Sequence, residues 1–308
     1  MHDVNLRCHQ LLLQLKMPRQ FLQRSLFAIL LVTAGGCAYI DAKQGDWIFR
    51  PTDAVWRGAR ELPPTFVEKM IPVSSASPGA ADQIHAWWAP VADVAPGQPA
   101  PVLLYLHGAR WNLSGSITRI PRWNQMGFSV LAIDYRGFGK STARSPTEHS
   151  ANEDADAAWR YLQSLAPRSR KFVFGHSLGA SMATHLALTH SDVEGVILEG
   201  AFTSIPEMMK TTQFGFLPLG GLVTQRFDNL ERINDIKVPL LIAHGTEDSI
   251  VPFNMGERLY AAAKAPKRFF KADGGSHHNL TSRYFNEYAQ AVWEHFGLSV
   301  YRTPPRAG

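Results

Sequence analysis

The pentapeptide at residues 175–179, Gly-His-Ser-Leu-Gly, constrains this chain more than any other feature. An apolar run at 171–174 precedes it, and the helix-favouring stretch 180–188 follows it. That order of strand, sharp turn and helix is the setting in which a G-x-S-x-G motif forms a nucleophile elbow. The glycines on both sides of the turn lack a Cβ, so the strand and the helix can approach closely. The motif therefore predicts a strand–turn–helix unit that holds the Ser177 hydroxyl above a parallel sheet.

A serine hydroxyl in such a turn needs two partners before it becomes a nucleophile. A base takes the hydroxyl proton, and an acid orients the base. In chains with this elbow the acid comes next in the sequence and the histidine last. A strand expected at 239–245 leads into Glu247 and Asp248. The last expected strand leads into His277 and His278, so candidates occur in the required order.

Six short motifs follow one another between residues 65 and 298. They are His107-Gly108, DYRGFGKS at 134–141, the elbow, EGAFTS at 199–204, HGTED at 244–248 and GSH at 275–277. In this order and spacing they resemble the α/β-hydrolase fold, in its serine aminopeptidase-like branch. The resemblance implies a mostly parallel, eight-stranded sheet flanked by helices, with the site at the carboxyl ends of the strands. It also implies hydrolysis of an ester, an amide or a thioester, with no cofactor and no metal.

The resemblance assigns a role to one residue of each downstream pair. Ser177 is the expected nucleophile. Asp248 is the expected acid, because the family's G-x-x-D spacing favours it over its neighbour Glu247. His277 is the expected base, because it fits a G-x-H arrangement. His278 would take that role if the loop shifted by one residue.

An oxyanion hole needs two backbone N–H groups directed at the developing negative charge. The Leu178 amide, directly after the nucleophile, supplies one, and the Ala109 amide holds the matching position in the loop after the strand that ends near residue 107. Relatives often carry Asn at the position of Ala109. Arg110 and Trp111 would then overhang the mouth of the pocket, as substrate contacts or as ordinary surface residues.

The rest of the chain agrees with an α/β architecture. Hydrophobic residues make up 45% and charged residues 19%, which supports a sizeable core and argues against disorder. Buried strands expected at 129–134 and 193–199 alternate with a helix expected at 150–165. Asp154 and Asp156 are expected on the outer side of that helix.

The segment at about 202–234 lies where such enzymes insert a lid, and here it is short and apolar. An apolar lid would exclude water and favour an acyl or other hydrophobic substrate. The same residues would also serve as a plain cover for the sheet edge. Aromatic and basic residues do not alternate anywhere in the chain, so no nucleic-acid partner is expected.

The N-terminus reads as a targeting segment. Arg19 and Arg24 precede an apolar run at 26–34 that is short for a membrane span, and small residues then lead to Cys37. The pattern resembles a bacterial lipoprotein signal with Cys37 as the lipidated residue, which implies a lipid-anchored protein of the cell envelope. An ordinary cleaved signal and an uncleaved anchor are the alternatives, and Met17 would give the signal a more typical length.

We therefore expect a targeting segment at 1–37, a connecting segment at 38–64 and an α/β-hydrolase domain at 65–300. The chain of 308 residues has a net charge of +5, and more than half of that excess lies within residues 1–36. The charge therefore says little about acidic partners. The two cysteines, Cys8 and Cys37, both precede the expected domain, so a thiol nucleophile and a cysteine zinc site are excluded there.

Three functions fit these observations. The first is a membrane-tethered serine hydrolase that cleaves a small-molecule or lipid-like carboxylic ester or thioester. The second is an aminopeptidase or amidase with the same triad. The third is a non-catalytic envelope protein that retains the fold. A dehalogenase or an epoxide hydrolase is disfavoured, because each would carry Asp in place of Ser177.

Overall fold

The computed structural model describes residues 39, 41, 43–56, 58, 61–74, 82–92, 97–211 and 219–298. The chain divides into two compact units, residues 1–43 and 44–308, and the fold and the site lie in the second. The targeting segment expected at 1–37, with Cys37, falls outside the described residues. Within the described part of the chain, no helix is both long enough and apolar enough to cross a membrane.

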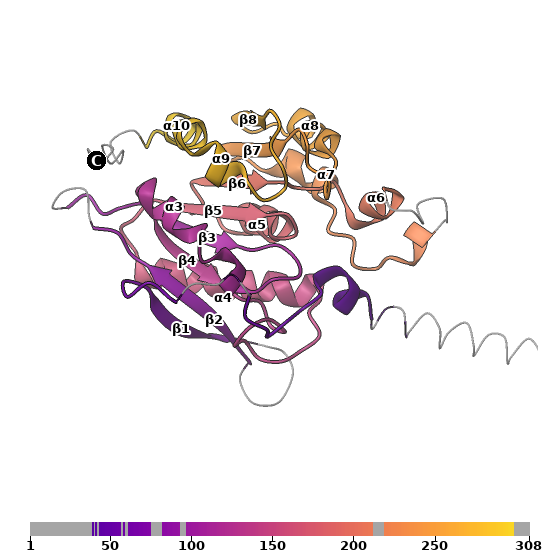
Figure 1. Cartoon of the computed structure of the whole chain (residues 1–308), viewed down its shortest axis with the longest axis horizontal. Helices are drawn as coiled ribbons and strands as arrows, with labels where there is room; N and C mark the ends of the chain where they lie inside the picture. Colours follow the sequence, from indigo (N-terminus) through magenta and orange to yellow (C-terminus); the bar gives the residue numbers. More distant parts are fainter. Residues whose placement is uncertain are drawn as a thin grey trace, which may run out of the picture. The chain divides into compact units, whose positions relative to one another are not determined.

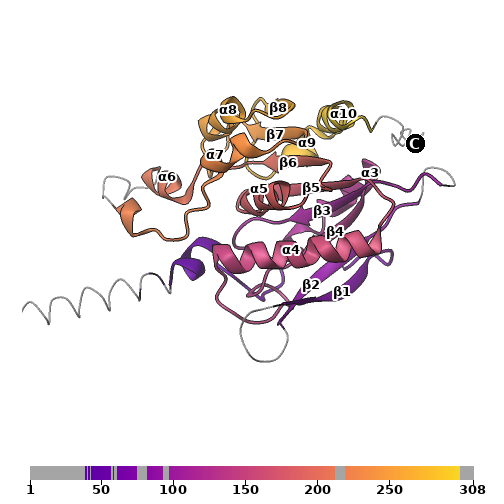
Figure 2. The ribbon, with the colours of Figure 1, turned by 180° about the vertical axis from the view of Figure 1, so that it is seen from behind.

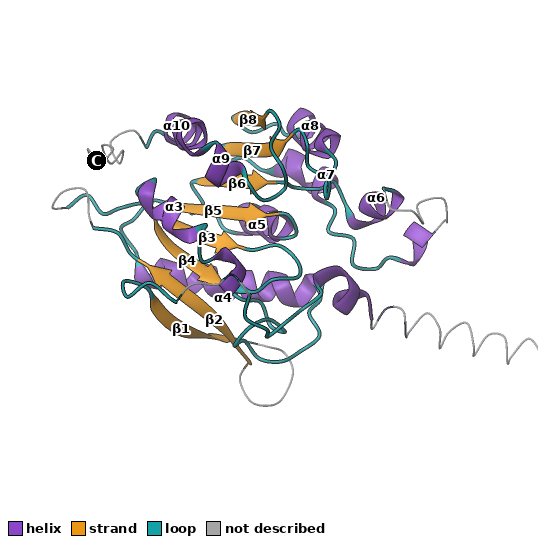
Figure 3. Cartoon of the chain, viewed as in Figure 1, coloured by secondary structure: helices purple, strands orange, loops and turns teal. Residues whose placement is uncertain are grey.

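An eight-stranded sheet forms the centre of the second unit (Figure 1, Figure 3). The strands are β1 Val67–Val73, β2 Asp82–Ala89, β3 Val102–Leu106, β4 Ser129–Ile133, β5 Lys171–His176, β6 Gly195–Glu199, β7 Leu240–Gly245 and β8 Lys267–Ala272. They lie in the order β1-β2-β4-β3-β5-β6-β7-β8. β2 pairs antiparallel with β1 and β4, and the other neighbouring pairs are parallel. The expected mostly parallel, eight-stranded sheet is thus confirmed.

Helices cover both faces of this sheet. They are α3 Ile120–Gln125, α4 Glu148–Leu165, α5 Gly179–Thr189, α6 Ile205–Lys210, α7 Asn229–Arg232, α8 Phe253–Ala262, α9 Leu280–Arg283 and α10 Phe285–Phe296, with the 3-10 helices η1 Leu113–Ser116, η2 Leu219–Leu222 and η3 Ile233–Asp235. α4, α5 and α8 contribute to the core on one face, and α3 and α10 to the core on the other. Figure 2 shows α4 and α5 in front of the sheet.

The strands separate two apolar cores because successive side chains point to opposite faces. In β3, Leu104 and Leu106 enter the core beneath α4 and α5, whereas Leu103 and Tyr105 enter the core beneath α3 and α10. All four side chains are buried, as expected for a parallel sheet covered on both sides. A shift of register by one residue would move every side chain of a strand to the opposite face of the sheet. Burial on both faces therefore fixes the strand pairing, and with it the position at which each strand ends at the edge of the sheet that carries the site.

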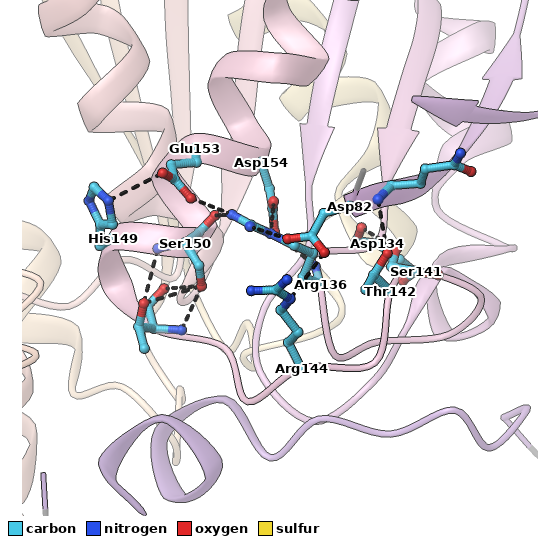
Figure 4. A network of polar contacts seen from close by, with 12 residues as sticks. Asp82, Asp134, Arg136, Ser141, Thr142, Arg144, His149, Ser150, Glu153 and Asp154 are labelled. Atoms are coloured by element: carbon cyan, nitrogen blue, oxygen red, sulfur yellow. Dashed lines mark hydrogen bonds and ion pairs between the residues drawn. The ribbon is translucent and has the colours of Figure 1, made fainter. Parts of the chain in front are cut away.

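Helix α4 begins at Glu148, two residues before the expected start, because Thr147 and Ser150 form a reciprocal capping box. The expectation that Asp154 faces outward is wrong, since this side chain is fully buried. Arg136 compensates the charge: its Nε donates to Asp154 Oδ1 at 2.6 Å and its Nη1 to Asp82 Oδ2 at 2.9 Å (Figure 4). Burial nevertheless raises the pKa of Asp154 to about 7. The network ties β2, the loop after β4 and α4 together.

Residues before the first strand also belong to this unit. Phe49 is fully buried and packs against the rings of Tyr135, Phe138 and Phe227, with centroids 5.6 to 6.4 Å apart. Part of the segment that the sequence suggested as a connection at 38–64 therefore contributes to the core.

The side-chain amide of Gln44 binds the backbone of the candidate lid at about 202–234. Its Nε2 donates to the Leu222 carbonyl at 2.9 Å, and its Oε1 accepts from the amides of Thr224 at 2.9 Å and Gln225 at 3.3 Å. One side chain thereby joins the segment before the sheet to the segment after η2.

Candidate active site

Ser177 occupies the turn between β5 and α5 with φ of +53°, in the left-handed region that non-glycine residues rarely adopt. The flanking glycines allow the turn to be tight. A Cβ on Gly175 would lie 2.4 Å from the Gly179 carbonyl oxygen, and one on Gly179 would lie 2.2 Å from the Leu106 carbonyl oxygen. The Ser177 amide donates to the Glu199 carbonyl at 2.8 Å, which fixes the turn to the end of β6. The local geometry is that of the expected elbow.

Asp248 and His277 meet across two loops that follow β7 and β8. His277 Nδ1 donates to Asp248 Oδ2 at 2.7 Å, and both side chains are buried. Asp248 Oδ1 accepts the amides of Ile250 at 2.9 Å and Val251 at 2.8 Å. Burial alone would raise the pKa of Asp248, but hydrogen bonds from His244 and His277 hold it well below its usual range. The carboxylate is therefore ionised at neutral pH and orients the imidazole.

The two neighbouring candidates, Glu247 and His278, do not form this carboxylate–imidazole pair. Glu247 is exposed, and its backbone amide donates to the Gly275 carbonyl at 2.9 Å. His278 is exposed and lies beside His277 with ring centroids 4.8 Å apart. Partial desolvation of its ring by neighbouring groups and the charge of His277 lower the pKa of His278 to about 4. The hydrogen bond to Asp248 is thus made by His277.

The end of β6 brings the serine and the histidine to one corner of the sheet. Glu199 holds the Ser177 amide, and the next residue, Gly200, lies against the His277 ring. A Cβ on Gly200 would lie 3.0 Å from both Cε1 and Nδ1 of that ring. Among the described residues, the Ser177 hydroxyl has no hydrogen-bond partner. Such contacts are often long in unliganded enzymes and tighten when substrate binds.

The expected oxyanion donors lie beside the serine. A Cβ on Gly108 would lie 3.1 Å from the Ser177 Cβ, so the loop after β3 passes close to the nucleophile. Ala109 follows in that loop, and Leu178 follows Ser177 in the chain. Neither amide donates a hydrogen bond to another described residue, so both are available to an oxyanion.

The rim of this site includes a contact that the sequence did not reveal. Arg110 has φ of +79°, and its amide donates to the Phe49 carbonyl at 2.8 Å. Trp111 is 43% exposed and makes an edge contact with Trp56, with ring centroids 4.1 Å apart. Two tryptophans from distant segments therefore form an exposed aromatic pair near the oxyanion loop. The sequence offered one indication of this pair, that both residues are tryptophan. Their contact itself depends on the tertiary structure.

A buried ion pair lies below the elbow and was not foreseen either. The Arg119 guanidinium donates to the fully buried Glu199 carboxylate. Nearby, His176 Nε2 lies 2.9 Å from the His277 carbonyl oxygen. Burial and the charge of Arg119 lower the pKa of His176 well below its usual range, so the ring is neutral. The His176 ring thereby contacts the backbone of the loop that carries the candidate base.

Two further histidines, at or next to the ends of β3 and β7, contact backbone carbonyl groups. His107 Nδ1 lies 2.7 Å from the Gly108 carbonyl, and His244 Nε2 lies 2.9 Å from the Val251 carbonyl.

Within the described part of the candidate lid at 202–234, α6, η2, α7 and η3 are short elements. Residues 212–218, which include much of its apolar sequence, lie outside the described residues.

Sheet order, elbow and loop positions together define an α/β hydrolase. Residues 97–229 match the family described as "Serine aminopeptidase, S33", a range that contains Ala109, Ser177 and Leu178. An uncharacterized protein of Mycobacterium tuberculosis is 30% identical over 253 residues, covering 82% of this chain and 86% of its own length. The chain belongs to the α/β-hydrolase superfamily and is a hydrolase.

Other similar proteins include lipases and esterases. The lysophosphatidylserine lipase ABHD12 of Danio rerio is 32% identical over 185 residues, which cover 54% of this chain and 48% of the lipase. The solved structure of an esterase of Pyrococcus furiosus has a TM-score of 0.62 at 21% identity, covering 80% of this chain and 98% of the esterase. An acylaminoacyl peptidase of Pyrococcus horikoshii has a TM-score of 0.56 at 15% identity, covering 79% of this chain and 43% of the peptidase. The two structural similarities support the fold.

Proposed function

We propose that this hydrolase cleaves a carboxylic ester or thioester through a Ser177–His277–Asp248 triad. The observation that carries the proposal is the buried 2.7 Å hydrogen bond between His277 and Asp248, at the sheet edge where Ser177 occupies its left-handed turn. A carboxylate, an imidazole and a hydroxyl in this order are the parts that acyl transfer needs.

The reaction follows from what each group can donate or accept. His277 Nδ1 donates to Asp248, so Nε2 carries the lone pair that takes the Ser177 proton as Oγ attacks the carbonyl carbon. The Ala109 and Leu178 amides stabilise the resulting oxyanion. His277 then gives the proton to the leaving alkoxide or thiolate, which departs and leaves an acyl-enzyme. Water then attacks the acyl carbon while the same Nε2 takes one of its protons, which forms a second tetrahedral intermediate. When this intermediate collapses, the bond to Ser177 Oγ breaks, His277 returns the proton to Oγ, and the carboxylic acid is released.

A lipid-like substrate is the class that the surroundings favour. The exposed pair Trp56 and Trp111 lies near the oxyanion loop, and Leu222, within the candidate lid, is 46% exposed. Aromatic rings with one polar edge suit a lipid–water boundary. A lipid on Cys37 would keep the enzyme at a membrane of the cell envelope, and the similarity to a lysophosphatidylserine lipase agrees with this substrate class.

An amide substrate is the second candidate, because the same acyl-enzyme chemistry cleaves peptides. The match to the serine aminopeptidase family favours it. In that case, a free amino group next to the scissile bond would need an acidic partner at the mouth of the site.

The first experiment is labelling of the purified protein and its Ser177→Ala variant with a fluorophosphonate. We expect labelling of the wild type alone. A series of nitrophenyl esters of increasing acyl length and an aminoacyl-nitroanilide then compare ester and amide turnover. A folded wild type that resists labelling and hydrolyses neither class would favour the non-catalytic alternative and refute the proposal.

A further inference from the structure

Three imidazole rings cluster beside the candidate nucleophile, although the proposed reaction needs only one. Ring centroids lie 4.7 Å apart for His176 and His277, 5.4 Å for His176 and His278, and 4.8 Å for His277 and His278. One ring nitrogen from each residue lies within 4.8 Å of the other two. Three neutral nitrogen ligands at one place are the donor set that borderline metal ions prefer.

Hydrogen bonds determine which nitrogens carry lone pairs. The Asp248 carboxylate accepts from His277 Nδ1, so the His277 lone pair is on Nε2. The His277 carbonyl oxygen can only accept, so His176 Nε2 carries the hydrogen and Nδ1 carries the lone pair. An oxygen acceptor on the far nitrogen is the usual arrangement behind a metal-binding histidine. Hydrogen bonds thus define the nitrogen that is free to bind a metal in two of the three rings, Nε2 of His277 and Nδ1 of His176.

The loop after β3 passes beside His176 Nδ1, and the residue of that loop that lies close to this nitrogen is a glycine. A Cβ on Gly108 would be only 3.2 Å from this nitrogen, so the absence of a side chain there keeps its approach open. Zinc bonds of about 2.0–2.1 Å place tetrahedral ligands about 3.4 Å apart. A cluster in which one nitrogen from each ring lies within 4.8 Å of the others must therefore contract by up to about 1.4 Å to bind the ion. His278 is exposed and can supply that movement, whereas His176 and His277 are buried.

We propose that His176, His277 and His278 form an inhibitory binding site for Zn²⁺ or a similar borderline divalent cation. Three histidines with a fourth position open to water complete a tetrahedral shell. An ion on His277 Nε2 occupies the lone pair that would take the Ser177 proton, so hydrolysis stops without any covalent change. The inhibition rests on the proposed function of His277, whereas binding of the ion does not.

The test uses the full chain, freed of metal with EDTA and desalted. ZnCl₂ is titrated by calorimetry for binding and during nitrophenyl ester hydrolysis for inhibition, each variant being compared with its own metal-free rate. His278→Gln removes one ligand. His149→Gln is the matched control, because His149 is a histidine of α4 whose side chain is 85% exposed. MgCl₂ serves as the control ion, since Mg²⁺ prefers oxygen ligands.

We expect Zn²⁺ to inhibit the wild type and EDTA to restore the rate. His278→Gln should weaken both binding and inhibition by at least about tenfold, since even loss of an outer-shell partner costs 10–100-fold. His149→Gln should change neither. Equal inhibition of wild type and His278→Gln, or equal inhibition by Mg²⁺, would overturn the site.

Calorimetry separates failure of this inference from failure of the proposed function. Zinc binding that depends on His278, in a protein that hydrolyses no ester, would leave the metal site standing and refute the esterase. Ester hydrolysis with fluorophosphonate labelling, together with zinc binding that ignores His278, would refute the metal site alone.

Discussion

Gly200→Ala perturbs the candidate base from outside the triad. Gly200 has φ of +58°, so an alanine there costs about 1–2 kcal/mol in backbone energy. Its Cβ would also lie 3.0 Å from the His277 ring, which must shift by a few tenths of an ångström. A misplacement of about 1 Å costs roughly 100-fold in rate, so we expect kcat to fall roughly three- to tenfold.

Gly297 provides the control, because it shares the strain without the collision. Its φ is +63°, and a Cβ there would meet no atom within 4 Å. Gly297→Ala should therefore lose a similar 1–2 kcal/mol of unfolding free energy, measured by urea denaturation, and keep its kcat. Steady-state hydrolysis of a nitrophenyl ester by both variants compares their kcat values. Wild-type kcat in a folded Gly200→Ala, or an equal loss in Gly297→Ala, would refute the reasoning.

Four other predictions concern single groups. Asp248→Asn should lower kcat by about 10³–10⁴ through a misoriented imidazole, while Glu247→Gln should leave it near the wild-type value; steady-state kinetics with the reverse ranking would reassign the acid. The lowered pKa of Asp248 means that its contribution to stability is complete above about pH 4 and is lost as the pH falls toward the folded-state pKa. The difference in unfolding free energy between wild type and Asp248→Asn should accordingly shrink below pH 4 in urea titrations, and a constant difference would contradict this. Arg119→Met leaves the buried Glu199 charge unpaired and should lower the free energy of unfolding by about 3–5 kcal/mol in the same urea assay. A loss as small as that of an ordinary surface substitution would contradict this. Cys37→Ser should move the protein from the membrane fraction to the soluble fraction, and retention would indicate another anchor.

The sequence was sufficient where the signal is local. The elbow and the apolar strands that end at the site edge depend on short patterns, and a mostly parallel sheet follows from their alternation with helices. For Asp248 and His277 the loops could be located, and the spacing typical of the family favoured one residue of each neighbouring pair, but that spacing does not show which side chain makes the contact. It depends on which side chain faces inward after two loops have folded against each other.

Other features could not be predicted from the sequence because they depend on partners distant in the chain. Asp154 was expected on the outer side of its helix, yet it is buried, and the hydrogen-bonded Arg136 of the preceding loop offsets the cost of burying its charge. The pairing of Trp56 with Trp111 and that of Arg119 with Glu199 join segments with no shared pattern. Periodicity records which face of an element is apolar, but it does not record charge compensation across elements.

The Gln44 side chain defines where the enzyme can be cut. Its amide holds three backbone groups between Leu222 and Gln225, and Phe49 fills the core just after it. A truncated version that starts at β1 would expose those backbone groups and leave an aromatic void. Expression of the catalytic unit therefore requires a start at or before residue 44, and a proteolytic cut that leaves the unit intact must occur upstream of that residue.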